Sequence, residues 1–245
     1  MNIQLISSTS KPLHVIAYTK GIIQGKHIHP DNISDEEAEA EFIDTLKSSI
    51  FAPFEFINFV FDFQEVPRAF THQHVRTRTA AYMQESLRFS TQEQNFPFEM
   101  GPSIQNDFDR KDTYQKVMEF LGRRYQELID MGAEVEDARG ILPINIHTGI
   151  SQVINYRNLI SAAEQRLCFQ AQAFHRNVFK RIREILISEV HPLIGRYLAP
   201  SCSHTGFCSW GGRLDRPCPL QKIYPMKPDP MEFINLEAKV LEQQR

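Results

Sequence analysis

The chain has 245 residues, of which 42% are hydrophobic and 23% charged, so it can bury a substantial core. Its net charge of −3 argues against a protein that attracts nucleic acid through a general positive field. The N-terminal sequence lacks the basic start and apolar run of a secretory signal, and no segment approaches about eighteen consecutive apolar residues. We therefore expect a cytoplasmic protein without a membrane partner, and nucleic acid is not the expected ligand.

The first fifty residues predict two strands and one helix. Short apolar runs at residues 3–7 and 13–17 are typical of strands. Residues 35–47 place acidic and apolar side chains at helical spacing, and Ser34 before them is a good N-cap.

An aromatic strand and an arginine-rich segment are predicted next. Residues 54–63 alternate phenylalanine with polar side chains, the pattern of a half-buried strand, and Pro67 ends it. Residues 68–75 suit a short helix that leads into a segment with three arginines, a serine and several amides. Charge-assisted donors in this number predict an anion site, whose side chains are Gln73, Arg76, Arg78, Gln84, Ser86 and Arg88.

The rest of the chain predicts a loop and two long helices around a second arginine-bearing block. Residues 91–106 are long enough for a loop that covers a substrate, and residues 109–131 form a helix that Gly132 closes. The second block spans residues 138–172. The helix after it carries an apolar stripe at Phe179, Ile182, Leu186 and Val190, and its other side, with Arg176, Lys180 and Arg183, is expected to face solvent.

The two blocks together resemble the flavin-dependent thymidylate synthases. That family carries Arg-His-Arg-x-x-Ser-x-Asn-x-x-Ser-x-Arg, and the chain matches both arginines of the first triplet and the final Ser-x-Arg. The second block matches Ala-Arg-x-x-Leu-Pro, Asn-x-Arg-x-Leu, a further arginine and Ala-Gln at the family's spacing. The resemblance covers roughly residues 50–190. The chain departs from the first motif at three positions, Thr77, Ala81 and Met83, where the family has histidine, serine and asparagine.

The resemblance implies both a fold and a reaction. The fold is α+β, a single catalytic domain over residues 1–198 with a small antiparallel or mixed sheet and a bundle of long helices, followed by a cysteine-rich extension at residues 199–245. The reaction is the FAD-dependent methylation of dUMP to dTMP, with methylenetetrahydrofolate as the carbon donor and NADPH as the reductant. The family works as a homotetramer whose active sites are shared between subunits.

The resemblance also assigns roles to individual residues. Arg166 takes the place of the catalytic arginine, whose planar cation against the N3 and O4 edge makes carbon 5 of the uracil nucleophilic. Substrate binding is implied for Gln73, Arg76, Gln84, Ser86, Arg88, Arg139 and Arg166. Flavin binding is implied for Arg76, Thr77, Arg78, Asn155, Arg157 and Ser161.

Other interpretations of these residues stay open. Ser86 alone is equally typical of a turn cap, and Arg166 alone is typical of an arginine paired with Glu164 on a helix. The three departures from the first motif are compatible with a flavin enzyme that acts on another pyrimidine nucleotide. A non-catalytic homologue that binds nucleotides or nucleic acid is a third reading, against which the acidic composition counts.

The C-terminal extension predicts a metal site of a separate kind. Cysteine and histidine side chains gather within seventeen residues, interrupted by glycines. Thiolate and imidazole are the ligands of structural zinc, so one zinc on Cys202, His204, Cys208 and Cys218 is the hypothesis. Three independent reduced thiols and an iron–sulfur cluster are the alternatives.

Overall fold

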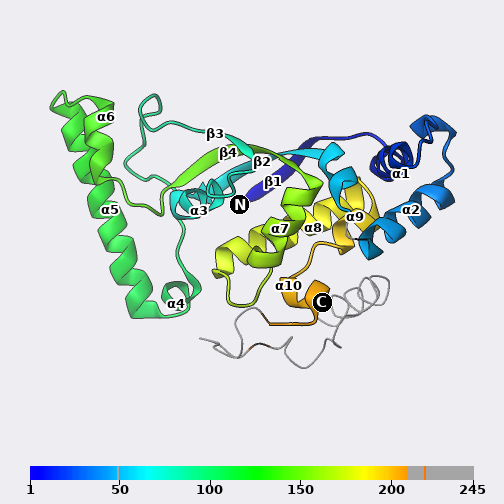
Figure 1. The fold of residues 1–245 in the computed structure, drawn as a ribbon. Coiled ribbons are helices and arrows are strands. Elements are labelled where there is room, and N and C mark those ends of the chain that lie inside the picture. The colour runs from blue at the N-terminus through cyan, green and yellow to red at the C-terminus, as the bar shows by residue number, and fades with distance from the viewer. Residues whose placement is uncertain (49, 209–217, 219–245) are drawn as a thin grey trace. The chain divides into compact units, whose positions relative to one another are not determined.

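The structure is a computed structural model that describes residues 1–48, 50–208 and 218 (Figure 1). The chain divides into two compact units. The first unit combines Met1–Gln4 with Asp62–Gln152, and the second combines Leu5–Phe61 with Val153–Arg245. Each unit is described by itself below.

Four strands form one sheet in the order β1-β2-β4-β3. The strands are β1 (Asn2–Ser8), β2 (Asn58–Pro67), β3 (Ala81–Gln84) and β4 (His147–Asn155), of which β1, β2 and β4 run from one unit into the other. The sheet is antiparallel and is accompanied by helices, so the predicted α+β class is confirmed.

The helices of the first unit include the longest one in the described chain, α5 (Figure 1). They are α3 (Arg68–His74), α4 (Pro102–Gln105), α5 (Phe108–Asp130), α6 (Val135–Ala138) and the 3-10 turn η3 (Arg139–Ile141). The predicted helices at residues 68–75 and 109–131 are therefore confirmed within one residue at each end, and Gly132 has the positive φ of 88° that favours glycine after a helix.

The second unit is mainly helical. Its elements are α1 (Pro12–Ile23), η1 (Pro30–Asn32), α2 (Asp35–Lys47), η2 (Ala52–Phe56), α7 (Tyr156–Arg166), α8 (Ala173–Glu189), α9 (Pro192–Arg196) and α10 (Ser201–Thr205). The predicted helix at 35–47 is confirmed, and the Ser34 hydroxyl accepts the Glu37 N–H at 3.2 Å as its cap.

The strand predicted at residues 13–17 is wrong and the strand predicted at residues 54–63 is wrong in part, and both errors have a local cause. Residues 13–17 are helical because Leu13, Ile16 and Ala17, at helical spacing, are the buried ones, and a short apolar run does not separate helix from strand. The aromatic strand begins at Asn58 and not at residue 54, because Pro53 starts a 3-10 turn that leaves Phe56 exposed.

The core of the first unit lies under α5 and beside α3. Phe96, Met118 and Ile146 are buried together, and Gly122 on α5 lets the loop before Phe96 approach the helix. A Cβ at Gly122 would stand 1.9 Å from the carbonyl oxygen of Gln94, so only glycine fits there. This contact ties the predicted loop at 91–106 to the longest helix.

Aromatic rings fill the core of the second unit. Tyr156, the first residue of α7, packs edge-on against Phe54 and Phe59, with ring centroids 5.2 and 6.1 Å away. Its hydroxyl donates to the carbonyl oxygen of Ile194 at 2.9 Å, so the buried polar group is satisfied. Burial raises the pKa of Tyr156 well above its ordinary value. The start of α7 is thereby fixed within its unit.

The solvent-facing side predicted for α8 needs one correction. Lys180 is exposed, but Arg183 has only 6% of its surface exposed, because α8 buries more of its circumference than the single stripe requires. Arg176 is half-buried and donates to the carbonyl oxygens of Phe169 and Ala171. None of the helices in the described chain combines the length and the apolar character needed to cross a membrane. The predicted boundary at residue 198 falls between α9 and α10 and stays a prediction.

Candidate active site

The predicted site residues fall into two groups, one in each unit. The arginine motif with Arg139 belongs to the first unit, and residues 155–166 with the described cysteines belong to the second. Geometry is therefore given separately for each group.

A polar network fixes the loop that carries the first arginines. The Tyr82 hydroxyl donates to the carbonyl oxygens of His74 (2.9 Å) and Thr77 (3.2 Å), and it accepts from the Gln152 amide at 3.1 Å. Gln152 also contacts the buried His74 ring at 3.1 Å. The backbone on either side of Arg76 is thus held by hydrogen bonds to Tyr82, while the Arg76 side chain is exposed. The His74 ring is thus a buried member of this network through its Nε2 atom.

Strand β3 presents alternating faces. Tyr82 and Gln84 are half-buried, and Gln84 donates to the Thr71 hydroxyl at 2.9 Å. Ala81 and Met83 are exposed, Met83 with 79% of its surface accessible. Two of the three departures from the family motif therefore lie together on the exposed face of one short strand. Gln84 supports α3, and Gln73 at the end of that helix is half-buried.

Arg88 and Arg139 both contact Glu136, and Ser86 contacts Arg88. The Arg88 guanidinium pairs with the Glu136 carboxylate at 2.6 Å, and Arg139 Nε donates to the Glu136 carbonyl oxygen at 3.1 Å. The Ser86 hydroxyl accepts the Arg88 N–H at 3.2 Å, so it does cap a turn in addition to lying beside the arginine. Residues that are about fifty positions apart in the sequence thus form one basic cluster in the first unit.

Helix α7 carries the second group. The Asn155 side chain caps it by accepting the Asn158 N–H at 2.9 Å. Arg157 forms an ion pair with Glu55, in which each side chain is about half exposed, and Ser161 lies one turn further along the same face. Arg166 is half-buried in the last turn. The helix therefore orders the predicted flavin residues and ends at the predicted catalytic arginine.

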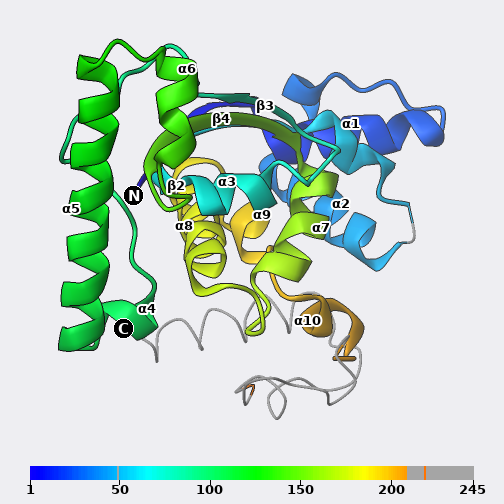
Figure 2. The same cartoon turned by 90° about the vertical axis from the view of Figure 1, so that its left-hand side faces the viewer.

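The C-terminal group is arranged differently from the zinc hypothesis. Both ring nitrogens of His204 are engaged, Nδ1 with the Glu164 carboxylate at 2.9 Å and Nε2 with the Tyr197 carbonyl oxygen at 3.0 Å. This histidine ties α10 to α7, and α10 lies beyond the lower end of α7 in Figure 2. Within residues 1–48, 50–208 and 218, no three His, Cys, Asp or Glu side chains are grouped so as to hold a metal ion.

Cys202 nevertheless lies near the other three described cysteines. All four are free and half-buried. Burial, and then the nearby thiols of Cys168, Cys218 and Cys208, raise the pKa of Cys202 to about 11. Cys168, just beyond the end of α7, had no role in the sequence-based prediction, because it stands more than thirty residues before the other three.

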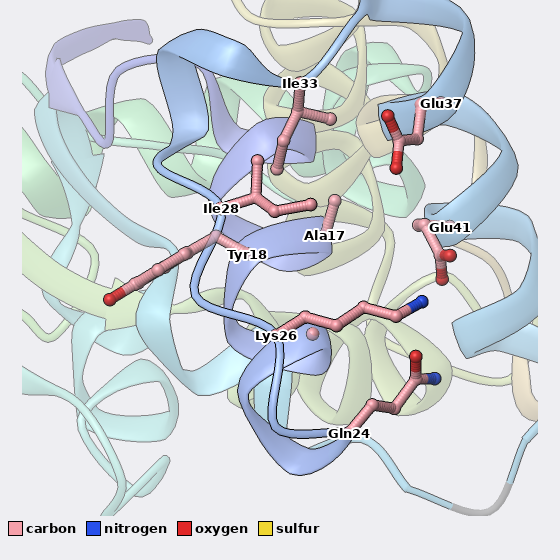
Figure 3. Close-up of a pocket in the computed structure, with 9 residues that line it drawn as sticks. Ala17, Tyr18, Gln24, Lys26, Ile28, Ile33, Glu37 and Glu41 are labelled. Atoms are coloured by element: carbon pink, nitrogen blue, oxygen red, sulfur yellow. The ribbon is translucent and has the colours of Figure 1, made fainter.

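Two hollows of the second unit do not suit a nucleotide. A cavity of about 30 Å³ beside α1 has room for on the order of one water molecule. Figure 3 shows Lys26 and Glu41 along its side, with the Tyr18 hydroxyl directed away from it. A groove of about 490 Å³ along α2 is lined by Glu36, Glu39 and Asp44 among others, and these carboxylates would repel a phosphate.

Comparison with known proteins places these features in a family. The family model for thymidylate synthase complementing protein matches residues 4–193 and so includes both arginine-bearing blocks. The chain belongs to this family. The resemblance recognised in the sequence is thereby confirmed.

Curated members of the thymidylate synthase complementing protein family resemble the chain over most of its length. A protein named flavin-dependent thymidylate synthase from Sulfurisphaera tokodaii is 29% identical over 96% of this chain and 90% of its own length. One of the same name from Pyrococcus furiosus is 30% identical over 85% and 89%. One from Geobacter sulfurreducens is 34% identical over 64% and 68%. The predicted enzyme class is therefore supported by relatives that share most of the chain.

A solved structure shares the fold. The crystal structure of a UMP/dUMP methylase from Streptomyces cacaoi, bound with 5-Br dUMP, matches with a TM-score of 0.64 and 19% identity over 80% of this chain and 93% of that one. At 19% identity the match shows that the two chains share a fold.

Sequence reasoning missed the acids that hold the arginines. Glu136 and Glu55 were assigned no role from the sequence, because no spacing rule connects them to Arg88 or Arg157. Tyr82 was missed because a tyrosine on a strand is ordinarily a packing residue. The one sequence signal for these acids was the excess of arginines in the motif, because clustered positive charges are stabilised by nearby carboxylates.

Proposed function

We propose that this chain is a flavin-dependent thymidylate synthase that methylates dUMP to dTMP. The observation that carries the proposal is the family match across both arginine-bearing blocks, in a chain that clusters Ser86, Arg88 and Arg139. Guanidinium groups with a neighbouring hydroxyl supply the charge-assisted donors that a nucleotide phosphate needs. Methylenetetrahydrofolate as carbon donor and NADPH as reductant are part of the same proposal, as is a cytoplasmic location.

The protein's own residues divide the work by position. Arg88, Arg139 and Ser86 bind the phosphate, with Arg76, Gln73 and Gln84 around them. Arg166 places its cation against the N3 and O4 edge of the uracil and stabilises the ring as its electron density rises. FAD, when bound, supplies the hydride chemistry of the reaction. The exposed guanidinium groups of Arg78 and Arg157 suit its diphosphate, and Thr77, Asn155 and Ser161 are the neighbouring polar groups.

A spectral titration of the purified full-length protein tests this function directly. We expect FAD to bind, with a shift of its visible absorption on entry into the site, and a second spectral change when dUMP is then added. Turnover with methylenetetrahydrofolate and NADPH should yield dTMP. A protein that takes up neither FAD nor dUMP contradicts the proposal. Binding of FAD with turnover of a different pyrimidine nucleotide would favour the divergent enzyme instead.

Replacement of the proposed catalytic arginine separates binding from chemistry. Arg166→Lys should keep FAD and bind dUMP within roughly an order of magnitude of the wild-type affinity, because one charge-assisted contact remains. It should lose most turnover, because a lysine cannot match two acceptor atoms in a planar fork. Arg181→Lys, on the exposed surface of α8 beside Glu184, is the matched control. Equal losses of flavin content and oligomer size in Arg166→Lys would identify a structural role.

A homotetramer with active sites shared between subunits is part of the proposal. Mixed tetramers of Arg78→Ala and Arg157→Ala chains should contain some intact flavin sites, if the two arginines of one site come from different subunits. We therefore expect flavin binding to recover after subunit exchange, although each variant alone binds poorly. Exchange is followed with two differently tagged chains. Complete exchange with no recovery contradicts a shared site.

We retain one structural zinc as a proposal, with a changed ligand set. The donor chemistry favours thiols, since Cys168, Cys208 and Cys218 each lie near Cys202, whereas both nitrogens of His204 are already bonded. The described residues are not arranged as a metal site, so zinc binding would have to draw these thiols together. Zinc binds the thiolate form, so its binding would release the protons of these thiols and the zinc–sulfur bonds would offset that cost. Residues 199–245 are on this proposal an extension to a catalytic domain over residues 1–198.

Metal analysis of the protein purified without chelator tests the zinc proposal. We expect about one zinc per chain, reduced by Cys168→Ser and by Cys202→Ser. His204→Gln should retain the zinc but loosen α10, seen as faster proteolysis near residues 200–208. A zinc content that falls equally in His204→Gln would restore histidine as a ligand. A wild-type protein without zinc overturns the proposal in favour of independent thiols, and iron with inorganic sulfide would identify a cluster.

A further inference from the structure

His204, on α10, makes two hydrogen bonds and a ring contact. Its Nδ1 atom lies 2.9 Å from the Glu164 carboxylate, and its Nε2 atom lies 3.0 Å from the Tyr197 carbonyl oxygen. The imidazole also stacks on the Tyr197 ring, with centroids 4.5 Å apart and planes inclined by 15°. Only 9% of the His204 side chain is exposed. A buried polar side chain with each of its polar atoms engaged is rigid, so the orientation of this ring is fixed.

Glu164 stands in the last turn of α7, two residues before Arg166. The last turn of a helix frays most easily, because its carbonyl groups have no partners further along the helix. Glu164 has 30% of its side chain exposed. Burial, and then the negative charge of Glu164, raise the pKa of Tyr197 to about 12. The Glu164 carboxylate therefore lies against both Tyr197 and His204, and it connects the end of α7 to α10.

Glu164 and Arg166 leave opposite sides of α7. An α-helix turns by about 100° per residue, so side chains two residues apart point about 200° away from each other. Helix α10 thus holds one side of the helix end through Glu164, and the half-buried Arg166 side chain leaves from the other side. Rotation or fraying of this turn would move the Arg166 guanidinium, and the His204–Glu164 contact opposes both movements.

A different residue fixes the chain that follows Arg166. Arg176 on α8 donates to the carbonyl oxygens of Phe169 at 2.8 Å and Ala171 at 3.2 Å. Its guanidinium also lies 4.9 Å from the centroid of the Phe169 ring. Arg176 thus sets the path of the connection from α7 to α8, whereas His204 reaches a side chain of the last turn of α7 itself.

We infer that His204 is a positioning residue for the reaction, which acts through Glu164 to hold the Arg166 guanidinium at the angle that the uracil edge requires. The inference rests on the proposed function, in which Arg166 carries the catalytic charge. A planar guanidinium that bonds two acceptor atoms tolerates little rotation. Displacement of a catalytic group by about 1 Å can reduce a rate about a hundredfold. Helix α10 thereby contributes to turnover through α7.

Steady-state kinetics of the FAD-loaded protein with dUMP test this role. His204→Ala removes the contacts to both partners, and we expect kcat to fall roughly tenfold to a hundredfold. The FAD content and the KM for dUMP should stay within about threefold of the wild-type values, because the substrate contacts remain. His204→Asn should restore much of the rate, since its amide nitrogen takes the place of Nδ1 and donates to Glu164. His204→Gln, whose amide takes the place of Nε2, should restore less.

A double-mutant cycle shows whether His204 acts through Glu164. Glu164→Ala should lower kcat as much as His204→Ala, and the double variant should be no slower than either, because both remove one interaction. Additive losses would mean that the two residues act independently, and the inference would be wrong. His191→Ala is the matched control, because its ring also has two contacts, with the Leu193 N–H at 3.2 Å and the Glu39 carboxylate at 3.4 Å. It should keep the wild-type kcat.

Zinc content, flavin content and unfolding temperature are measured for each variant, because a purely structural role would change them. Loss of zinc in His204→Ala, with a rate that added zinc restores, would show that His204 acts through the metal and would overturn the inference. Losses of flavin and of dUMP affinity in proportion to kcat would do the same. If His204→Ala does not fold, His204→Asn and His204→Gln decide, since both lose the ring stack. Equal rates for these two contradict a role through Glu164.

The outcome separates this inference from the proposed function. If the wild-type protein does not convert dUMP, the proposed function fails and the inference fails with it. If the wild type converts dUMP and His204→Ala is equally fast, the inference alone is wrong. A loss of kcat that His204→Asn restores, at unchanged KM and flavin content, supports both.

Discussion

An arginine that binds an anionic ligand must first give up the partner that it has in the unliganded protein, so that partner must be weakly bound. The Arg88–Glu136 pair meets this requirement, because 54% and 50% of the two side chains are exposed. An ion pair in that much water contributes only about 0–1 kcal/mol, so a phosphate can take over the guanidinium at small cost. Arg157 and Glu55 form a pair of the same kind in the second unit. Arg139 is held by a backbone carbonyl, and its charge stays available.

The backbone beneath the arginines of the first unit is held by more hydrogen bonds than the exposed Arg76 side chain is. His74, Gln152 and Tyr82 form a network that takes up the backbone carbonyls on both sides of Arg76. Buried networks of this kind are rigid when each member is satisfied. An exposed guanidinium on a fixed backbone can change its rotamer to meet a ligand, while the backbone of the motif keeps its position.

This division explains how the chain tolerates its departures from the family motif. The Thr77 position contributes its backbone carbonyl to the Tyr82 hydroxyl, and any residue type supplies that group. Ala81 and Met83 project from the exposed face of β3, so they leave its buried face undisturbed. The departures are therefore neutral for the fold.

The sequence by itself determined the motifs, their order and the helices with clear caps. Ser34 and the acidic turn after it predict α2, and the paired arginine blocks predict the family. These features are local, since each depends on residues within one or two turns of the chain. Short apolar runs were ambiguous for the same reason, because residues 13–17 become helical only when Leu13 and Ile16 find a common core.

Only the tertiary structure decided which charges meet. Glu136 reaches Arg88, and Arg68 lies near Arg139, across separations of about fifty and seventy residues that no local pattern encodes. The same holds for His204, whose ring nitrogens are taken by Glu164 and Tyr197. Ligand preference depends on distance and burial, because both the strength of a charge interaction and the cost of an unpaired donor change with them. Those two quantities arise only when distant segments pack together.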